Sequence, residues 1–271
     1  MSDRVVPDPS HPGAFRVQLG DTAQSWVDPR RPDHLVFEYV QHIAAVLEST
    51  LLLRPERERV RIVHVGGGGL TLPRWVEWRR PHTAQIVLEP DRDLVAEVRR
   101  KLPLARRSGI KIREADGVSG LTAMPGGYAD CVIVDAFDGG RVPAELATEE
   151  WFAETFRVLR PGGLVIMNLI DLAPFAWSRR CLAGMAAHFR HLLLGAEPAV
   201  FKGRRFGNLV VTGSCSPIPV QAIERRCAAS AFPYRMLGRK ELAGWWGGAL
   251  PFREGDAQQS PALTGKHFWF G

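Results

Sequence analysis

Hydrophobic and polar residues follow two periods that alternate along the chain from Val60 onward. Short, continuous apolar runs predict strands over 60–65, 84–89, 110–115, 129–137 and 164–170. Apolar residues at helical spacing predict helices over 70–80, 91–103, 148–163 and 174–194. Apolar strands that alternate with helices are typical of a parallel sheet covered on both faces.

The two ends of the chain add elements of other kinds. Residues 1–33 are rich in Pro, Asp and Arg, which predicts an irregular segment with short strands. An apolar stripe then predicts a helix over 33–53, with Asp33 as its N-cap. Strands over 199–203 and 207–214 are separated by a short turn, so we expect an antiparallel pair. The whole pattern predicts an α/β fold with a doubly wound, mostly parallel sheet, in which residues 1–55 form a small N-terminal extension and residues 56–271 form the main domain.

Composition narrows the class of protein. The chain of 271 residues is 45% hydrophobic and 24% charged, and no apolar run approaches the roughly 20 residues of a membrane span. The N-terminus also lacks the apolar core of a secretory signal, so we expect a soluble, cytoplasmic protein without a membrane partner. The net charge of +6 comes mainly from arginines interleaved with acidic residues, which favours solvated helix faces. We therefore expect no nucleic-acid partner.

Glycines and acidic residues gather where the predicted strands end. They are, in chain order, Gly66, Gly67, Gly68, Gly69, Glu89, Asp116, Gly117, Asp135 and Asp138. Ligands of open α/β sheets bind beyond the carboxyl ends of the strands, so these residues predict a ligand site. Glu89 follows the glycines at about the 20-residue distance of a carboxylate that binds ribose hydroxyls. The sequence therefore predicts a nucleoside site.

Spacing and charge decide which nucleoside is favoured. The sequence GGGGL at 66–70 lacks the spaced glycines of GxGxxG, the pattern of dinucleotide sites. Several carboxylates at one site favour a cationic ligand, such as a sulfonium nucleoside or a polyamine, over a pyrophosphate. Turn formation is the competing explanation for Asp138, which precedes two glycines. Two carboxylates three residues apart at the end of a strand still favour function.

Residues from about Gln24 to Gly213 resemble the spermidine synthase family of aminopropyltransferases, a branch of the Rossmann-like, seven-stranded fold of class I methyltransferases. The resembling segments are TAQSW (22–26), HLVFEYVQH (34–42), IVHVGGGGL (62–70), VLEPD (87–91), ADG (115–117), VDAFDGGRVPAEL (134–146) and GNLVVTGS (207–214). They are similar, in that order, to the family's glutamine segment, DEFxYxEMxxH helix, GGGDG loop, ribose-binding acid, adenine-binding Asp-Gly, DSSDP catalytic loop and late strand.

The resemblance implies transfer of the aminopropyl group of decarboxylated S-adenosylmethionine to an amine such as putrescine, with release of methylthioadenosine and without a metal. It implies that Asp135 is the catalytic base. The nucleoside-binding residues would be Gln24, Gly66, Gly67, Gly68, Glu89, Asp116, Gly117 and Pro143, and the amine-binding residues would be Asp138, Glu38 and His42. We also expect a homodimer, because the family is oligomeric and the tail holds Trp245, Trp246, Phe268, Trp269 and Phe270.

Three departures from the family pattern leave alternatives open. Gly69 stands where the family has an aspartate that faces the aminopropyl ammonium, which favours a methyltransferase that uses ordinary S-adenosylmethionine. Val36 aligns with the family's helix tyrosine, and bulky Phe137 separates the two acids. These changes favour a non-catalytic homologue that binds nucleosides or polyamines. The retained pair of Asp135 and Asp138 favours aminopropyl transfer.

Overall fold

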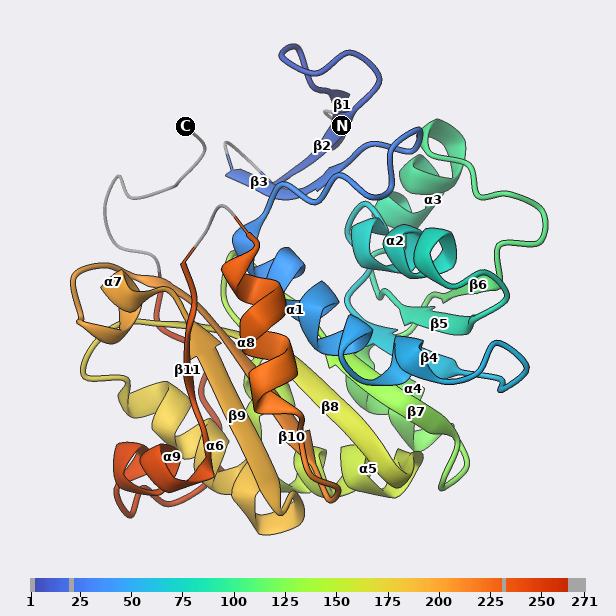
Figure 1. Ribbon diagram of the computed structural model, residues 1–271. Helices are drawn as coiled ribbons and strands as arrows, with labels where there is room; N and C mark the ends of the chain where they lie inside the picture. Colours follow the sequence, from blue (N-terminus) through green and yellow to red (C-terminus); the bar gives the residue numbers. More distant parts are fainter. Residues whose placement is uncertain (1–2, 20–21, 231–232, 263–271) are drawn as a thin grey trace.

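A mixed sheet of eight strands forms the centre of the computed structural model, which describes residues 3–19, 22–230 and 233–262 (Figure 1). The strand order is β11-β9-β10-β8-β7-β4-β5-β6. The parallel part contains β4 (Arg61–Val65), β5 (Ala84–Leu88), β6 (Ile110–Arg113), β7 (Ala129–Val134) and β8 (Leu159–Asp171). The antiparallel part contains β9 (His191–Ala196), β10 (Gly207–Ser214) and β11 (Arg235–Leu237). The doubly wound α/β class is confirmed, and β11 makes the sheet one strand wider than the seven strands expected.

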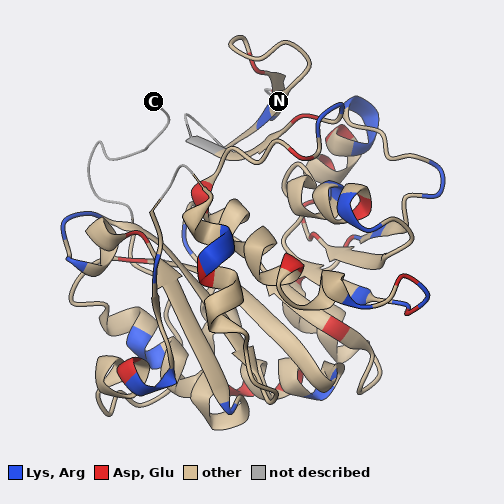
Figure 2. Cartoon of the chain, in the orientation of Figure 1, with Lys and Arg blue, Asp and Glu red and all other residues tan. Residues whose placement is uncertain are grey.

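Helices cover both faces of this sheet (Figure 1). One face packs against α4 (Gly117–Thr122), α5 (Glu149–Val158), α6 (Ala176–His188) and α9 (Arg239–Trp246), with Phe152 and Leu182 in its core. The other face packs against α1 (Glu38–Glu48), α2 (Thr71–Arg79) and α8 (Val220–Ala228). The short helices are η1 (Leu51–Leu53), η2 (Ala144–Ala147) and α7 (Pro198–Phe201). Figure 2 shows many of the charged residues on helices and loops, and β9 and β10 at the centre of the antiparallel part carry no Lys, Arg, Asp or Glu.

The N-terminal segment forms a separate antiparallel sheet of β1 (Val5–Pro7), β2 (Phe15–Leu19) and β3 (Thr22–Val27). Val17 and Val27 of this sheet share a core with Leu70, at the start of α2, and with Val98 of α3 (Arg92–Lys101). The small sheet therefore lies over the carboxyl ends of β4 and β5, where the sequence predicts a ligand.

Several predicted helix boundaries are wrong. The first helix begins at Glu38 rather than at Asp33, because Asp33 lies in a turn that the His34 amide closes by donating to the Arg31 carbonyl (3.0 Å). The predicted helix over 174–194 ends at His188, and residues 191–196 form β9 between β10 and β11. A short apolar run is compatible with a buried strand or a buried helix, so periodicity alone does not separate them.

The final strand pair is also different from the expected one. β10 is the predicted strand, but residues 198–201 form α7, and the antiparallel neighbours of β10 are β8 and β9. Near the end of the chain, Trp245 and Trp246 are partly buried against the core. The tail residues Phe268, Trp269 and Phe270 lie outside the described residues. Among the described residues, no helix is long and apolar enough to cross a membrane.

Candidate active site

A cavity of about 500 Å³ lies at the carboxyl ends of β4, β5 and β7, beneath the N-terminal sheet. It brings together predicted residues from distant parts of the chain, such as Gln24 on β3 and Pro143 before η2. The predicted residues that line it are Gln24, Gly66, Gly67, Gly68, Glu89, Asp116, Gly117, Asp135, Asp138 and Pro143. The strand-end rule therefore located eight of these residues at one cavity, and the family resemblance added Gln24 and Pro143.

The glycine loop brings its backbone close to the end of the neighbouring strand. Gly66 has a φ of +97°, and a Cβ atom there would lie 2.2 Å from the Asp135 carbonyl oxygen. Only glycine fits this position. The turn closes with a hydrogen bond from the Leu70 amide to the Gly67 carbonyl (2.8 Å), and α2 follows at once. The loop thus exposes backbone atoms, rather than side chains, to the cavity.

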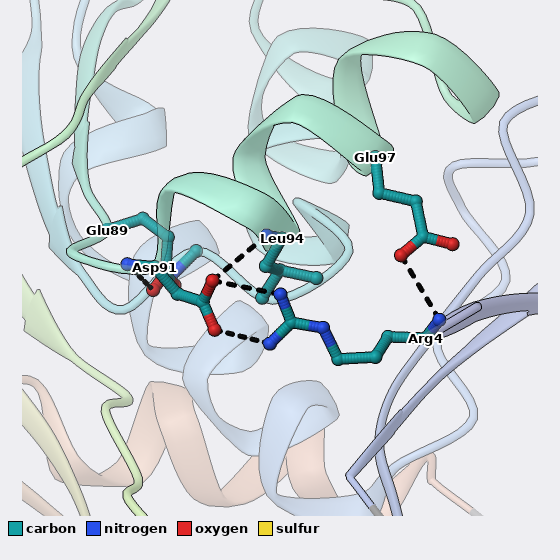
Figure 3. A network of polar contacts seen from close by, with 6 residues as sticks. Arg4, Glu89, Asp91, Leu94 and Glu97 are labelled. Atoms are coloured by element: carbon teal, nitrogen blue, oxygen red, sulfur yellow. Dashed lines mark hydrogen bonds and ion pairs between the residues drawn. The ribbon is translucent and has the colours of Figure 1, made fainter. Parts of the chain in front are cut away.

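Glu89 is held in place by two backbone amides. The Gly67 amide donates to its Oε2 atom (2.9 Å), and the Asp91 amide donates to its Oε1 atom (3.1 Å). Figure 3 shows the second of these bonds, together with the ion pair between Asp91 and Arg4. A carboxylate fixed in this way keeps lone pairs for further donors, such as the two hydroxyls of a ribose.

Asp116 is the N-cap of α4, and its carboxylate accepts hydrogen bonds from the Ser119 amide (2.8 Å) and hydroxyl (2.7 Å). These bonds from Ser119 lower the pKa of Asp116, so the group is ionised at neutral pH. The next residue, Gly117, packs closely, since a Cβ atom there would lie 2.6 Å from Val65 Cγ1. This corner therefore has a fixed carboxylate beside a buried, closely packed glycine.

Asp135 lies at the end of β7, and each of its carboxylate oxygens accepts one hydrogen bond. Asn168 on β8 donates to Oδ1 (3.0 Å), and the Tyr39 hydroxyl on α1 donates to Oδ2 (3.3 Å). Burial raises the pKa of Asp135, and the hydrogen bonds from Asn168 and Tyr39 offset part of this rise. A carboxylate with a raised pKa is a stronger base than an exposed one. Asp138, three residues further, is exposed at the rim of the same cavity.

The structure separates Glu38 and His42 from the other predicted residues. Both line a second cavity of about 470 Å³, between α1 and α8. They lie four residues apart and therefore share one face of α1, whereas Tyr39 and Val40 face the cavity of Asp135. His42 stacks on Tyr234 with ring centroids 4.5 Å apart, and burial lowers the pKa of His42 to about 3. In this arrangement His42 is a neutral packing residue.

Two departures seen in the sequence have a different meaning in the structure. A tyrosine does reach the site, and it is Tyr39 rather than a residue at position 36. Gly69 faces the N-terminal sheet: its amide donates to Ser25 Oγ (3.2 Å), and a Cβ atom there would lie 3.0 Å from Val27 Cγ1. Strands β2 and β3 thus fill the space that a side chain at position 69 would need.

Sequence reasoning missed Tyr39 and Asn168. A signal existed for both: Tyr39 is the tyrosine within the resembling helix segment, three positions beyond the aligned Val36, and Asn168 is the polar residue inside the apolar run LVIMNLI. A buried polar residue in a central strand needs a hydrogen-bond partner, which is here the carboxylate of Asp135. Among the described residues, no group of three or more His, Cys, Asp or Glu side chains is placed to hold a metal ion.

Comparison with known proteins relates this geometry to a family. No family model matches the chain. The crystal structure of a probable spermidine synthase from Corynebacterium glutamicum ATCC 13032 superimposes with a TM-score of 0.85 and 26% identity, over 92% of this chain and 92% of that one. A polyamine aminopropyltransferase from Chromobacterium violaceum is 26% identical over 149 residues, which are 55% of this chain and 54% of that protein. The chain is spermidine synthase-like.

Methyltransferases share the fold of this spermidine synthase-like chain. Human methyltransferase-like protein 13, solved in complex with SAH, superimposes with a TM-score of 0.54 and 20% identity, over 70% of this chain and 93% of that one, a likeness of fold alone. The chain spans about half the length of the curated relatives it matches.

Proposed function

We propose that this protein transfers the aminopropyl group of decarboxylated S-adenosylmethionine to an amine and releases methylthioadenosine. The observation that carries the proposal is Asp135, a partly buried carboxylate with two hydrogen-bond donors, in the same cavity as a glycine loop and Glu89. The cavity of about 500 Å³ lies in the size range of small-molecule sites. The likeness to spermidine synthases over most of the chain supports the same assignment.

The nucleoside would occupy the end of the cavity formed by β4, β5 and α4. Glu89 would accept hydrogen bonds from the ribose hydroxyls, and the backbone of Gly66, Gly67 and Gly68 would lie against the sulfonium end. Asp116, Gly117 and Pro143 would line the adenine, and Gln24 would approach from the N-terminal sheet. No positive side chain is needed here, because the donor is itself a cation.

The amine would enter on the side of Asp138 and Tyr39. An alkylamine with a pKa near that of lysine, about 10, arrives protonated, and its nitrogen has no free electron pair. Asp135 would accept one proton from this ammonium. The freed nitrogen pair would then form a bond to the aminopropyl carbon next to sulfur, while the carbon–sulfur bond breaks and its electron pair stays on sulfur. Neutral methylthioadenosine leaves, and Asp138 would hold a second ammonium of the acceptor at the rim.

The direct test is mass spectrometry of products after incubation with a single donor and a panel of di- and polyamines. With decarboxylated S-adenosylmethionine, we expect one amine to gain one aminopropyl group and methylthioadenosine to appear in equal amount. Methylation of an acceptor with ordinary S-adenosylmethionine would replace the proposal by a methyltransferase. Binding of methylthioadenosine without any product would replace it by a binding protein.

A homodimer and a cytoplasmic location stay predictions. Light scattering during size-exclusion chromatography decides the first, since a homodimer doubles the 30.1 kDa mass of the chain. Fractionation of the source cells decides the second.

A further inference from the structure

Arg4 links the N-terminal sheet to the nucleoside end of the cavity. Its guanidinium forms a two-pronged ion pair with Asp91, in which the bond to Oδ1 is 2.9 Å long (Figure 3). Both residues line the cavity. Asp91 is also the N-cap of α3, where its Oδ1 atom accepts the Leu94 amide (3.0 Å). The hydrogen bonds and the charge of Arg4 hold the pKa of Asp91 at about 2, so the ion pair is fully formed at neutral pH.

The same network continues from Asp91 to the predicted ribose carboxylate. The Asp91 amide donates to Glu89 Oε1 (3.1 Å), and Glu89 Oε2 accepts the Gly67 amide (2.9 Å). At the other end of the network, the backbone amides of Arg4 and Val5 donate to Glu97 of α3 (3.1 and 3.0 Å). A continuous chain of hydrogen bonds and ion pairs therefore runs from the N-terminal sheet, through α3, to the glycine loop.

We propose that Arg4 is a positioning residue for the ribose of the bound nucleoside and that it acts through Asp91 on Glu89. The inference rests on the proposed function, because it takes a nucleoside as the ligand. The Asp91 and Glu89 carboxylates are two residues apart and share one cavity wall. With Arg4 present, its charge compensates Asp91, and Glu89 is the carboxylate left to accept the ribose hydroxyls.

Without Arg4, the two carboxylates repel each other. Asp91 then turns away from Glu89 or draws a proton or cation between them, and in either case its backbone amide no longer holds Glu89 Oε1 in the same position. The effect on binding should therefore depend on the ribose hydroxyls. If Arg4 had a purely structural role, its loss would instead weaken the binding of all nucleosides alike.

Isothermal titration calorimetry with two ligands separates these cases. The ligands are methylthioadenosine and its 2′,3′-dideoxy analogue, which lacks the hydroxyls that Glu89 would accept. The test variants are Arg4→Met, which keeps the stem of the side chain, and Asp91→Asn, which keeps an N-cap residue for α3. The matched control is Arg16→Met, which removes the ion pair of Arg16 with Asp8 (2.8 Å) in the same sheet, away from the cavity.

For Arg4→Met, we expect methylthioadenosine to bind about tenfold more weakly, the scale of one charge-assisted hydrogen bond. The affinity for the dideoxy analogue should change by no more than about twofold. Asp91→Asn removes the carboxylate that repels Glu89, so it should bind methylthioadenosine within about twofold of the wild type, and the double variant should bind it more tightly than Arg4→Met alone. Arg16→Met should bind both ligands like the wild type. A thermal melt of each variant shows that it is folded before titration.

Two results would overturn the inference, and they differ in what else they overturn. If the wild type binds methylthioadenosine and Arg4→Met binds it equally well, loses both ligands equally, or is not restored by adding Asp91→Asn, Arg4 does not position the ribose through Asp91, and the proposed function is untouched. If the wild type binds neither methylthioadenosine nor decarboxylated S-adenosylmethionine, the nucleoside site is wrong, and the role of Arg4 is wrong with it.

Discussion

Asn168→Leu isolates a hydrogen bond that favours the ionised form of Asp135. Asn168 lies on β8 beside Asp135 and does not line the cavity, so its replacement changes no direct contact with a ligand. Leucine keeps the branched shape of the side chain, with two larger methyl groups in place of the amide oxygen and nitrogen, and has no donor. Burial raises the pKa of Asp135, and the bond from Asn168 lowers it, so the loss of this bond moves the pKa further upward.

The size of the effect follows from the bond. The Asn168 Nδ2 to Asp135 Oδ1 distance is 3.0 Å, an ordinary length, and a hydrogen bond to a charged group contributes about 1.5–3 kcal/mol. A base with a higher pKa stays protonated to higher pH, so the acid limb of kcat/KM moves to higher pH. On that limb, kcat/KM of Asn168→Leu should fall by about tenfold or more, because 1.36 kcal/mol corresponds to a factor of ten.

The assay measures kcat/KM for the donor, decarboxylated S-adenosylmethionine, at saturating amine and at pH values across the acid limb. Thr212→Val is the matched control, since Thr212 is a buried polar residue on β10 that faces no part of the cavity. It should leave the acid limb where the wild type has it. A profile of Asn168→Leu that is lower at every pH, with an unchanged acid limb, would refute the reasoning and make Asn168 a merely structural residue.

The remaining predictions concern stability. Burial would raise the pKa of Asp8, but hydrogen bonds from Trp26 (2.7 Å) and its other donors hold it at about 2. The stabilisation is therefore present above the unfolded pKa of about 4 and is lost as the pH falls toward 2. Asp8→Asn should cost about 2 kcal/mol in urea unfolding at pH 7, and no loss at that pH would contradict the assignment. Gly195→Ala would put a Cβ atom 2.5 Å from His42 Cε1 and should destabilise the protein by about 1–3 kcal/mol, whereas a neutral effect would mean that His42 moves freely.

Sequence patterns sufficed for the parallel sheet and for the residues at its strand ends. Gly66, Glu89 and Asp135 come directly after apolar strands, and topology alone brings such positions to one edge. The residues that hydrogen-bond to Asp135 were harder to predict from the sequence. Tyr39 lies in the first turn of α1, and its contact with Asp135, 96 positions away, is a tertiary contact that periodicity does not predict.

Other differences arise where tertiary contacts decide. Residues 191–196 are compatible with helix or strand on their own, and their place between β10 and β11 makes them a strand. The Arg4–Asp91 pair joins residues 87 positions apart, and no local pattern predicts it. The departure at Gly69 illustrates the same limit, since the loop's neighbours are β2 and β3, which the sequence left as irregular or short strands.

The central claim is that Asp135 acts as the base of an aminopropyl transfer. The most direct measurement compares the wild type with Asp135→Asn in single-turnover reactions, in which the aminopropylated amine and methylthioadenosine are counted by mass spectrometry. Calorimetry with methylthioadenosine on the same samples shows whether the nucleoside end is intact. We predict equal amounts of both products from the wild type, none from Asp135→Asn, and methylthioadenosine affinities within about threefold of each other. Transfer by Asp135→Asn at the rate of the wild type would contradict the account.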